Sequence, residues 1–375
     1  MQCDYYDRGA CRSCTWMNVG YADQLARLEQ ITAGALGDLV PADVWLPVGH
    51  GRESGFRNKA KLVVGGRRGA PTLGILDGDF RGVDLTGCGL YEPGLSMALP
   101  ALAQFVAETG LTPYDIPRRT GELKHLIVTH SPAGELMVRF VLRSPGQLRR
   151  LEDGLPDLLA AVPGLRVVTA NLQPEHKAVL EGPDEAVLTD QLTLPMPVND
   201  VVLHLGPRSF FQTNTEMAAL LYRQAASWID DDRPSSVLDL YCGVGGFAMH
   251  AADGVRAVRG LEVSADAVRC AERSVRENAK PLGDIRFETA DADAELAIDA
   301  ETVIVNPPRR GIGADLAAAI EASDARTLIY SSCHPGTLAR DLRALPSWRV
   351  NAARLIDMFP QTTHAEVLIR LARAA

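Results

Sequence analysis

A cysteine ends an apolar, strand-like run near the C-terminal end of this 375-residue chain. The run of residues 327–332 leads directly into Cys333, and Pro335 then interrupts the backbone pattern. In an α/β sheet, a residue just beyond the end of a strand faces the crevice where ligands bind. An ionised cysteine is a strong nucleophile, so the position predicts a catalytic thiol. Taken alone, the same cysteine would be read as a buried structural thiol.

A glycine-rich turn predicts another part of the same crevice. The apolar strand ending at Leu240 is followed by Tyr241 and Cys242, and then by the glycine turn, which begins at Gly243 and reads Gly-Val-Gly-Gly. Glycines at such a turn let the backbone approach a ligand at the N-terminus of the next helix. The spacing matches neither the G-x-G-x-x-G of dinucleotide-binding proteins nor a P-loop. We expect Cys242, like Cys270, to be a small buried residue.

Polar residues follow the next strands at positions suited to a nucleoside. Glu262 ends the strand after the glycine turn, 19 residues beyond Gly243, where its carboxylate can accept hydrogen bonds from ribose hydroxyls. Asp291 follows the third strand and can meet an adenine edge, and Asn306 begins an Asn-Pro-Pro turn. This arrangement is typical of enzymes that use S-adenosylmethionine. The alternatives are that Glu262 caps the next helix and that Asp291 belongs to a solvated acidic stretch, residues 291–295.

Four cysteines in the first quarter of the chain could hold a metal centre. Cys3, Cys11 and Cys14 lie close together, and Cys88 lies far downstream in a glycine-rich segment. Four thiolates can bind zinc or an iron–sulfur cluster, and the spacing alone leaves both open. Such a site would also hold the N-terminal segment against the rest of its domain. Four independent cysteines are the alternative.

The order of predicted elements divides the chain into two parts. The first part reads as α+β, with β structure over residues 56–90, and its predicted helices (21–36, 95–109) and strands (123–129, 136–142, 166–173, 201–205) alternate irregularly. A helix capped by Thr213 or Asn214 then runs to about residue 229. Beyond it, strands at 236–240, 257–262, 285–289, 302–305, 327–331 and 366–371 alternate with helices that begin near 246, 265, 314 and 335.

Strict alternation of strand and helix predicts a Rossmann-like α/β domain, whose sheet is mostly parallel and covered by helices on both faces. We therefore expect an N-terminal and central region over residues 1–205 and a catalytic domain over residues 206–375. The helix near residues 21–36 can pack on the catalytic domain.

Composition and charge restrict the function further. Short apolar runs predict no membrane span, and the opening lacks the pattern of a secretory signal. Seven cysteines without such a signal favour the reducing cytoplasm and metal or catalytic roles over disulfides. The net charge is −9, but residues 51–150 carry 14 Lys or Arg against 9 Asp or Glu. A locally basic region on an acidic protein favours contact with phosphates, although an ordinary solvated surface would look the same.

Taken together, these residues resemble the RNA uracil-C5 methyltransferases that depend on S-adenosylmethionine. The resemblance covers nearly the whole chain, and the motifs follow one another in the same order. It is strongest to the branch of the family that acts on 23S ribosomal RNA. The segments that carry it are the cysteine-rich opening, residues 56–61, Ser-Phe-Phe-Gln-Thr-Asn at 209–214, residues 306–313 and Asp-Met-Phe-Pro at 357–360.

The resemblance implies a mechanism and a set of residues. Cys333 would be the nucleophile and Glu366 the base, and the alternative for Glu366 is a carboxylate on an edge strand. The target would be an unpaired loop uridine of 23S ribosomal RNA, bound by a monomer. Arg309 and Arg310 could hold phosphates nearby or be surface charges that flank a helix. The resemblance also implies a [4Fe–4S] cluster on Cys3, Cys11, Cys14 and Cys88, and S-adenosylmethionine contacts from Gln212, Tyr241, Glu262 and Asn306, beside Gly243 and Asp291.

The sequence departs from the family pattern at three places, the first of which is Tyr241, which stands where a Phe is commoner, keeps the ring and adds a hydroxyl. Many relatives have an aspartate where this chain has Asn306, and a neutral amide can orient groups by hydrogen bonding but cannot take up a proton as a carboxylate does. Many relatives also carry a small β-barrel RNA-binding domain before the cysteines, which we do not expect here because Cys3 is almost the first residue.

Three other functions remain open from the sequence. The first is a transfer-RNA uracil-C5 methyltransferase. The second is an N-methyltransferase, because Asn-Pro-Pro motifs also occur in enzymes that methylate amino groups, and these need no cysteine nucleophile. The third is an RNA-binding or redox-sensing cluster protein without catalytic activity, which would not bind S-adenosylmethionine.

Overall fold

The chain folds into two compact units. The computed structural model describes residues 1–177, 179–291 and 297–374. The first unit comprises Met1–Cys14 and Glu53–Met196, and the second comprises Thr15–Arg52 and Pro197–Ala375. This division differs from a single boundary near residue 205, because the segment Thr15–Arg52 belongs with the C-terminal unit. In that segment, helix α2 (Tyr21–Leu36) packs in the core of the second unit through Leu28 and Leu36.

The first unit is built on a mixed sheet. In the described part of the unit, seven strands pair in the order β4-β3-β2-β5-β6-β7-β8. The unit also holds the short helix α1 (Asp4–Asp7), helices α3 (Pro93–Glu108) and α4 (Leu148–Ala161) and a 3-10 turn (Pro145–Gln147). The strands are β2 (Lys59–Arg67), β3 (Ala70–Leu76), β4 (Gly82–Asp84), β5 (Leu123–His130), β6 (Leu136–Leu142), β7 (Leu165–Leu172) and β8 (Asp184–Val187).

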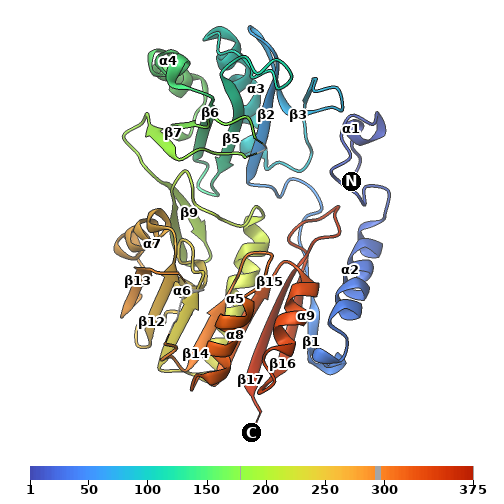
Figure 1. Cartoon of the computed structure of the whole chain (residues 1–375), viewed down its shortest axis with the longest axis vertical. Coiled ribbons are helices and arrows are strands. Elements are labelled where there is room, and N and C mark those ends of the chain that lie inside the picture. The colour runs from blue at the N-terminus through green and yellow to red at the C-terminus, as the bar shows by residue number, and fades with distance from the viewer. Residues whose placement is uncertain (178, 292–296, 375) are drawn as a thin grey trace. The chain divides into compact units, whose positions relative to one another are not determined.

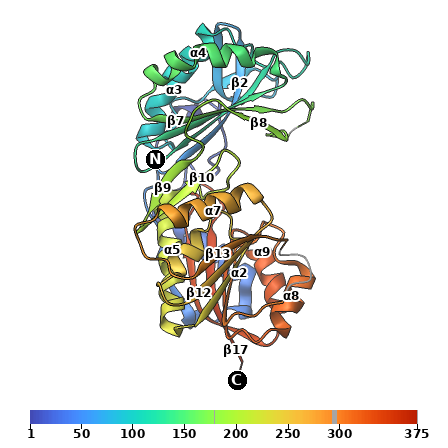
Figure 2. The same cartoon turned by 90° about the vertical axis from the view of Figure 1, so that its left-hand side faces the viewer.

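Helices α3 and α4 cover one face of this sheet (Figures 1 and 2). The apolar side chains that contact them alternate along the strands with side chains that point to the other face. On β2, Ala60, Leu62 and Val64 are buried in the core that these helices share. Lys59, Lys61 and Val63 point to the opposite face because successive side chains of a strand alternate. We call this opposite side the helix-free face.

The second unit has the predicted α/β architecture. In its described part, eight strands pair in the order β1-β16-β17-β15-β14-β11-β12-β13, and β9 and β10 form a separate pair. The strands are β1 (Trp45–Gly49), β9 (Leu194–Val198), β10 (Val201–Leu205), β11 (Ser236–Leu240), β12 (Ala257–Glu262), β13 (Ile285–Thr289), β14 (Thr302–Val305), β15 (Thr327–Ser332), β16 (Trp348–Ile356) and β17 (Glu366–Arg373). Most neighbours run parallel, but β17 is antiparallel to both β15 and β16.

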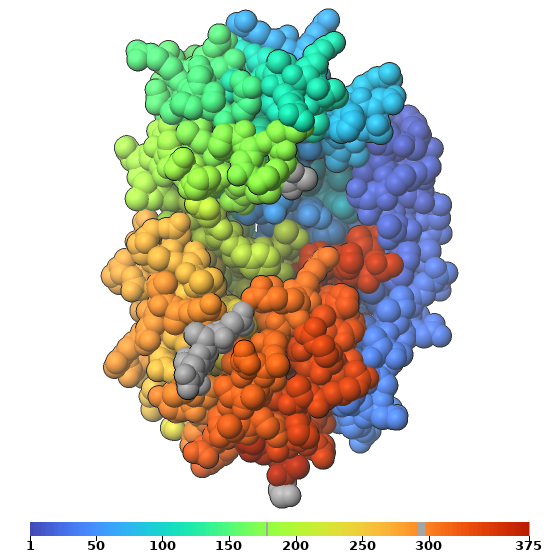
Figure 3. Space-filling model, viewed as in Figure 1, coloured from blue at the N-terminus to red at the C-terminus, as the bar shows by residue number. Residues whose placement is uncertain are grey.

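Helices cover both faces of this larger sheet (Figure 1). One face carries α2, α8 (Gly313–Ala322) and α9 (Pro335–Arg343), and the other carries α5 (Thr215–Asp232), α6 (Gly246–Ala251) and α7 (Ala265–Glu277). Two 3-10 turns, Gly37–Leu39 and Ala42–Val44, connect α2 to β1. The space-filling view shows α2 in blue at the surface (Figure 3). No helix in the described ranges is long and apolar enough to cross a membrane.

Most of the predicted elements are confirmed, and the misses have physical causes. Asn214 caps α5 by accepting a hydrogen bond from the Met217 amide. Helix α4 was not predicted, because Gly154 and Pro156 interrupt its helical pattern. Strands β1 and β16, which pair with each other at one side of the sheet, were also not predicted.

The core of the first unit generates a stability prediction. Leu126 of β5 is fully buried in the core that the sheet shares with helix α3, so Leu126→Ala removes packed atoms and leaves a cavity. We expect a loss of about 2–5 kcal/mol in the free energy of unfolding of this unit, measured by urea denaturation. Met97→Ala, at a side chain that is 75% exposed on α3, is the matched control and should change stability little. Equal effects of the two substitutions would contradict this account of the core.

Candidate active site

A cavity of about 550 Å³ lies in the second unit, at the edge where its parallel strands end. It brings together every residue that the sequence analysis assigned to catalysis or to S-adenosylmethionine. The lining residues are Phe210, Gln212, Tyr241, Gly243, Leu261, Glu262, Val263, Ala290, Asp291, Asn306, Pro307, Pro308, Arg309, Arg310, Cys333, Phe359 and Glu366.

The strand directions explain why these residues meet. Strands β11, β12, β14 and β15 are parallel, so the residues at and beyond their carboxyl ends lie along one edge of the sheet. Glu262, Asn306 and Cys333 occupy these positions. Strand β17 runs the opposite way, so its first residue, Glu366, reaches the same edge from the other direction. An antiparallel final strand therefore places a carboxyl in a cavity otherwise built from parallel strand ends.

The glycine turn after β11 depends on left-handed backbone conformations. Gly243 and Gly245 have φ of +56° and +87°. A Cβ on Gly245 would stand 2.6 Å from the ring of Phe287, so a side chain does not fit there. Tyr241 also has a positive φ, +59°, which is uncommon for a residue with a side chain. The turn is therefore held in a strained form that opens its backbone to the cavity.

Glu262 is fixed by backbone groups at the cavity wall. One carboxylate oxygen accepts a hydrogen bond from the Gly243 amide at 3.1 Å, and the other accepts one from the Ser264 amide at 2.9 Å. Glu262 therefore fixes the residue before α7, which agrees in part with the alternative that it caps this helix, although the N-cap residue itself is Ser264. A carboxylate has about four acceptor positions, so Glu262 can still accept hydrogen bonds from a ribose.

Gln212 and Asp291 lie at other parts of the wall. Gln212 is buried, whereas Asp291 is exposed and lines the cavity after β13. The alternative that Asp291 is part of a solvated acidic stretch concerns residues 292–295, which lie outside the described residues. Asp239, in β11, is fully buried, and one of its oxygens accepts a hydrogen bond from the Ala248 amide at 3.0 Å. It therefore supports the start of helix α6.

Glu366 is a buried carboxyl in the cavity. Its side chain is 2% exposed, and burial raises its pKa to about 7, although a hydrogen bond donated by the Ser331 hydroxyl opposes the shift. The alternative of an edge-strand carboxylate is wrong, because β17 lies between β15 and β16 in the interior of the sheet. A carboxyl with this pKa can hold or accept a proton near neutral pH.

Neighbouring groups shift the pKa of the Cys333 thiol in opposite directions. Burial is the largest cause that raises the pKa of its thiol, and the charge of Glu366 adds to it. The Arg309 guanidinium lowers that pKa through its charge and a hydrogen bond to the Cys333 side chain. From the sequence, Arg309 was expected only to contact a phosphate or to be a surface charge. Its position just beyond the Asn306 turn, at the end of the strand next to β15, was the signal that could have identified it.

Phe210 is a second residue whose role was missed. Its ring lines the cavity and is 69% exposed, which is unusual for a large apolar side chain. It belongs to the Ser-Phe-Phe-Gln segment that had been noted only for the family resemblance. An exposed ring beside a cavity can stack on a planar base. The prediction that Cys242 and Cys270 are buried thiols is confirmed.

The four remaining cysteines lie in the first unit. Burial raises the pKa of Cys14 to about 12, and the next causes are the charges of Cys88, Cys11 and Cys3. These interactions mean that the structure brings the four thiols near one another. The part of the chain that the structure describes contains no group of three or more His, Cys, Asp or Glu arranged to hold a metal ion. The thiols are thus gathered but do not form a closed set of ligands.

Comparison with known proteins places the chain in a family. The model of the tRNA (Uracil-5-)-methyltransferase family matches residues 186–374. A 23S rRNA (uracil(747)-C(5))-methyltransferase RlmC from Halothiobacillus neapolitanus is 45% identical over the whole of both chains, and one from Yersinia pseudotuberculosis is 43% identical over 99% of each. The crystal structure of a Pyrococcus abyssi tRNA (uracil-54, C5)-methyltransferase with S-adenosyl-L-homocysteine has a TM-score of 0.80 at 25% identity, covering 96% of this chain and 85% of the other.

The fold is therefore that of an α/β methyltransferase. On the identity and coverage of these relatives, the chain belongs to the RNA uracil-C5 methyltransferase family.

The contact between Arg309 and Cys333 generates a prediction that needs no substrate. Arg309→Met removes the positive charge that favours the thiolate, so the pKa of Cys333 should rise and its alkylation by iodoacetamide should slow at a fixed pH. The rate is measured across pH by mass spectrometry of the peptide that contains Cys333. Arg310→Met removes a neighbouring cation from the same cavity wall and serves as the control. If both variants are alkylated at the wild-type rate, Arg309 does not stabilise the thiolate.

Proposed function

We propose that this protein transfers a methyl group from S-adenosylmethionine to carbon 5 of a uridine in 23S ribosomal RNA. One observation supports the proposal above all. Cys333, Arg309 and Glu366 line the same cavity as the residues that suit a nucleoside cofactor. These residues all come from one chain, so we propose that it acts as a monomer.

The cofactor is proposed to bind along the glycine turn. Gly243 offers backbone close to the ligand, Glu262 accepts hydrogen bonds from the ribose, and Asp291 lies where an adenine edge would be. Gln212, Tyr241 and Asn306 line the remaining wall and can orient the reacting end. Bound S-adenosylmethionine supplies an electrophilic methyl group on sulfur. The S-adenosyl-L-homocysteine in the Pyrococcus abyssi relative supports this choice of cofactor.

Cys333 is proposed to start the reaction, because carbon 5 of uracil is a poor nucleophile. Its thiolate adds to carbon 6, forming a carbon–sulfur bond and moving an electron pair into an enolate. Carbon 5 of that enolate can then take the methyl group. Arg309 stabilises the thiolate before attack, which offsets the burial that disfavours it. Phe210 can stack on the uracil ring when the base enters the cavity.

Glu366 is proposed to finish the reaction. After methyl transfer, carbon 5 carries both a methyl group and a hydrogen. Glu366 takes that proton, the double bond between carbons 5 and 6 forms again, and the bond to the Cys333 sulfur breaks. Its pKa of about 7 suits this role, since the carboxylate form is present near neutral pH and still binds a proton readily. Ser331 holds the carboxylate through the hydrogen bond that it donates.

The substrate is proposed to be an unpaired loop uridine, since a base must leave its stack to reach the thiol. The names of the full-length relatives support the uridine equivalent to position 747 of 23S ribosomal RNA. A transfer RNA is the second candidate, favoured by the fold that this chain shares with the Pyrococcus abyssi tRNA methyltransferase. Methylation of a 23S ribosomal RNA fragment and of transfer RNA transcripts, measured side by side with labelled S-adenosylmethionine, separates the two.

A [4Fe–4S] cluster is proposed for Cys3, Cys11, Cys14 and Cys88. Four thiolates suit such a cluster, and the mutual influence of the four thiols supports their closeness. The segments that carry them are tied together, because the Tyr5 hydroxyl accepts a hydrogen bond from the amide of Gly87, next to Cys88, at 3.1 Å. The role proposed for the cluster is structural, holding the N-terminal segment in the first unit.

Substitutions at the two catalytic residues should stop the reaction at different stages. Cys333→Ala should give neither methylation nor a protein–RNA adduct. Glu366→Gln cannot accept the proton as a carboxylate does, so it should transfer one methyl group and accumulate an adduct. Turnover of Glu366→Gln should fall about 100-fold or more, as expected on loss of a general base. Denaturing gels with a labelled methyl donor measure both outcomes.

Rapid turnover by Glu366→Gln without an adduct would show that another group is the base. Full activity of Cys333→Ala would remove the covalent mechanism altogether and favour an amino-methylating enzyme, which needs no thiol.

The cluster proposal predicts the metal content of the purified protein. Anaerobically purified protein should contain about four irons per chain with equivalent sulfide. Cys88→Ser should lose most of the iron and destabilise the first unit, whereas Cys270→Ser, at a buried thiol of the second unit, should keep it. Iron and sulfide analysis provides the measurement. Stoichiometric zinc without sulfide would refute the proposed cluster.

A further inference from the structure

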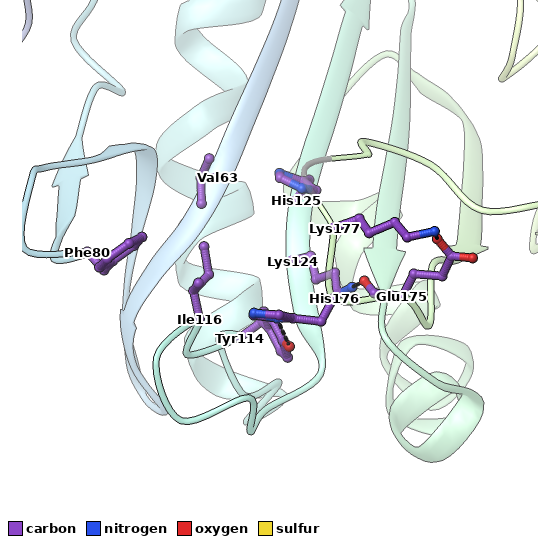
Figure 4. Close-up of a pocket in the computed structure, with 9 residues that line it drawn as sticks. All are labelled: Val63, Phe80, Tyr114, Ile116, Lys124, His125, Glu175, His176 and Lys177. Atoms are coloured by element: carbon purple, nitrogen blue, oxygen red, sulfur yellow. Dashed lines mark hydrogen bonds and ion pairs between the residues drawn. The ribbon is translucent and has the colours of Figure 1, made fainter.

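A second cavity, of about 270 Å³, lies in the first unit and belongs to none of the chemistry above (Figure 4). It opens at the helix-free face of the sheet, over the paired residues Val63 of β2 and His125 of β5. The rest of its wall comes from Lys124 of β5, the turn between β3 and β4, the segment before β5 and the segment after β7. The residues of the turn and the two segments are Phe80, Tyr114, Ile116, Glu175, His176 and Lys177.

Aromatic rings surround this cavity. Figure 4 shows Phe80 on one side and Tyr114 joined to His176 on another. The Tyr114 hydroxyl and Nδ1 of His176 are 2.9 Å apart, so each ring holds the other in place. Phe80 is 53% exposed and has φ of +61°, an uncommon conformation for a phenylalanine, and its ring stands at the rim. Rings held in this way offer flat apolar surfaces to a flat ligand.

Lys124 supplies a buried positive charge at the same place. Its side chain is 6% exposed, and the ammonium donates to the Gln173 amide oxygen and to the Glu175 carbonyl oxygen, the latter at 2.7 Å. It also lies 4.9 Å from the centre of the Tyr114 ring. Within the described ranges, no carboxylate forms an ion pair with it. Burial and the charge of Arg143 lower the pKa of this ammonium, and the charges of Glu122 and Glu175 oppose that shift without forming an ion pair. A buried cation whose direct partners are neutral oxygens and a ring is only partly compensated, and an anion beside it would be stabilised.

The surroundings add to this preference for an anion. Lys177 lines the cavity at its outer edge, paired with Glu175 at 2.8 Å, and Lys61 is exposed on the same helix-free face. Residues 51–150 carry the local excess of positive charge in an otherwise acidic chain. Burial and the charge of Lys124 lower the pKa of His125 to about 4, so its imidazole is neutral at pH 7. A neutral imidazole can stack on a base or exchange hydrogen bonds with it.

We propose that this cavity binds one unpaired nucleotide of the RNA substrate, outside the target uridine, with its base against Phe80, Tyr114 and His176 and its phosphate beside Lys124. Flat rings with a nearby cation are the means by which proteins hold single-stranded RNA, and a sheet face free of helices can present them. The proposal rests on the proposed function, since it takes RNA to be the substrate. The nucleotide acts as an anchor that positions the RNA and takes no part in the chemistry.

The test measures binding of the full-length protein to a 23S ribosomal RNA fragment that contains the target loop, by fluorescence anisotropy at several salt concentrations. Phe80→Ala and His176→Ala each remove a stacking surface and should weaken RNA binding about tenfold. Both side chains are exposed, so folding should be preserved. Lys124→Met should weaken binding by a similar factor and should also make the salt dependence shallower by about one phosphate contact. Affinity for S-adenosylmethionine should not change in any of these variants.

Two matched controls lie on the helix-covered side of the same unit. Met97→Ala removes an exposed apolar side chain of α3, and Arg149→Met removes an exposed cation of α4. Both should bind RNA as the wild type does. As a direct readout, RNA carrying 4-thiouridine or 6-thioguanosine at unpaired positions is irradiated on the protein. Crosslinks to peptides that contain Phe80, Tyr114 or His176 would support the proposal.

The outcomes separate this inference from the proposed function. If the wild-type protein neither binds nor methylates the fragment, the proposed substrate is wrong. If the wild type binds and methylates it but Phe80→Ala and His176→Ala keep full affinity, the cavity does not hold RNA and the inference is overturned. Loss of affinity in the controls as large as in the variants would overturn it as well, because the effect would then not belong to the cavity.

Discussion

The burial of the Glu366 carboxyl beside the Cys333 thiol is the constraint on which the active site depends. Two groups that both form anions line one cavity, and burial disfavours the charged form of each, so the charge of Glu366 raises the cost of ionising Cys333. Two neighbours oppose this effect. The Arg309 guanidinium lowers the pKa of the Cys333 thiol, and the Ser331 hydroxyl lowers that of the Glu366 carboxyl by donating a hydrogen bond to it. The chemistry proposed here requires both anions, but at different stages, which is compatible with a site where holding both charges at once is costly.

The sheet of the second unit makes that pairing possible. If every strand were parallel, Cys333 and the cofactor-facing residues would still lie at one edge of the sheet. The general base would then have to come from a loop. The antiparallel strand β17 starts at this edge instead, so Glu366 is fixed by pairing on both sides of its strand. A base held on a strand is positioned more accurately than one on a loop. The price is burial, and the raised pKa of Glu366 is its direct result.

The first unit contributes a different kind of site. Helices α3 and α4 cover one face of its sheet and leave the other to polar and aromatic side chains. On that face, Lys124 is buried without an ion-pair partner among the described residues, and the rings of Phe80, Tyr114 and His176 lie against the same cavity. Sites that do chemistry and sites that hold a long substrate have different needs. The catalytic cavity has opposed charges around reacting atoms, whereas this one has flat surfaces and a cation.

The sequence by itself determined the order of elements in the second unit and the identity of the residues at its strand ends. Alternation of apolar strands and helices is a local pattern, and parallel strands carry their functional residues at predictable places, so Glu262, Asn306 and Cys333 could be found without coordinates. The cysteines of the first unit could be named in the same way. Their closeness could not, because Cys88 meets the others only through the fold.

Only the tertiary structure decided the rest. The direction of β17 depends on its pairing between β15 and β16, which the chain order does not reveal, so the sequence left Glu366 open to an edge-strand reading. The helix α4 was hidden by Gly154 and Pro156, whose local cost is overcome by packing of Leu151 and Leu158 in the core. The second cavity joins Phe80, Tyr114, Lys124 and His176, which share no motif or spacing. Burial, charge balance and ring contacts are properties of neighbours in space, and a sequence gives only neighbours along the chain.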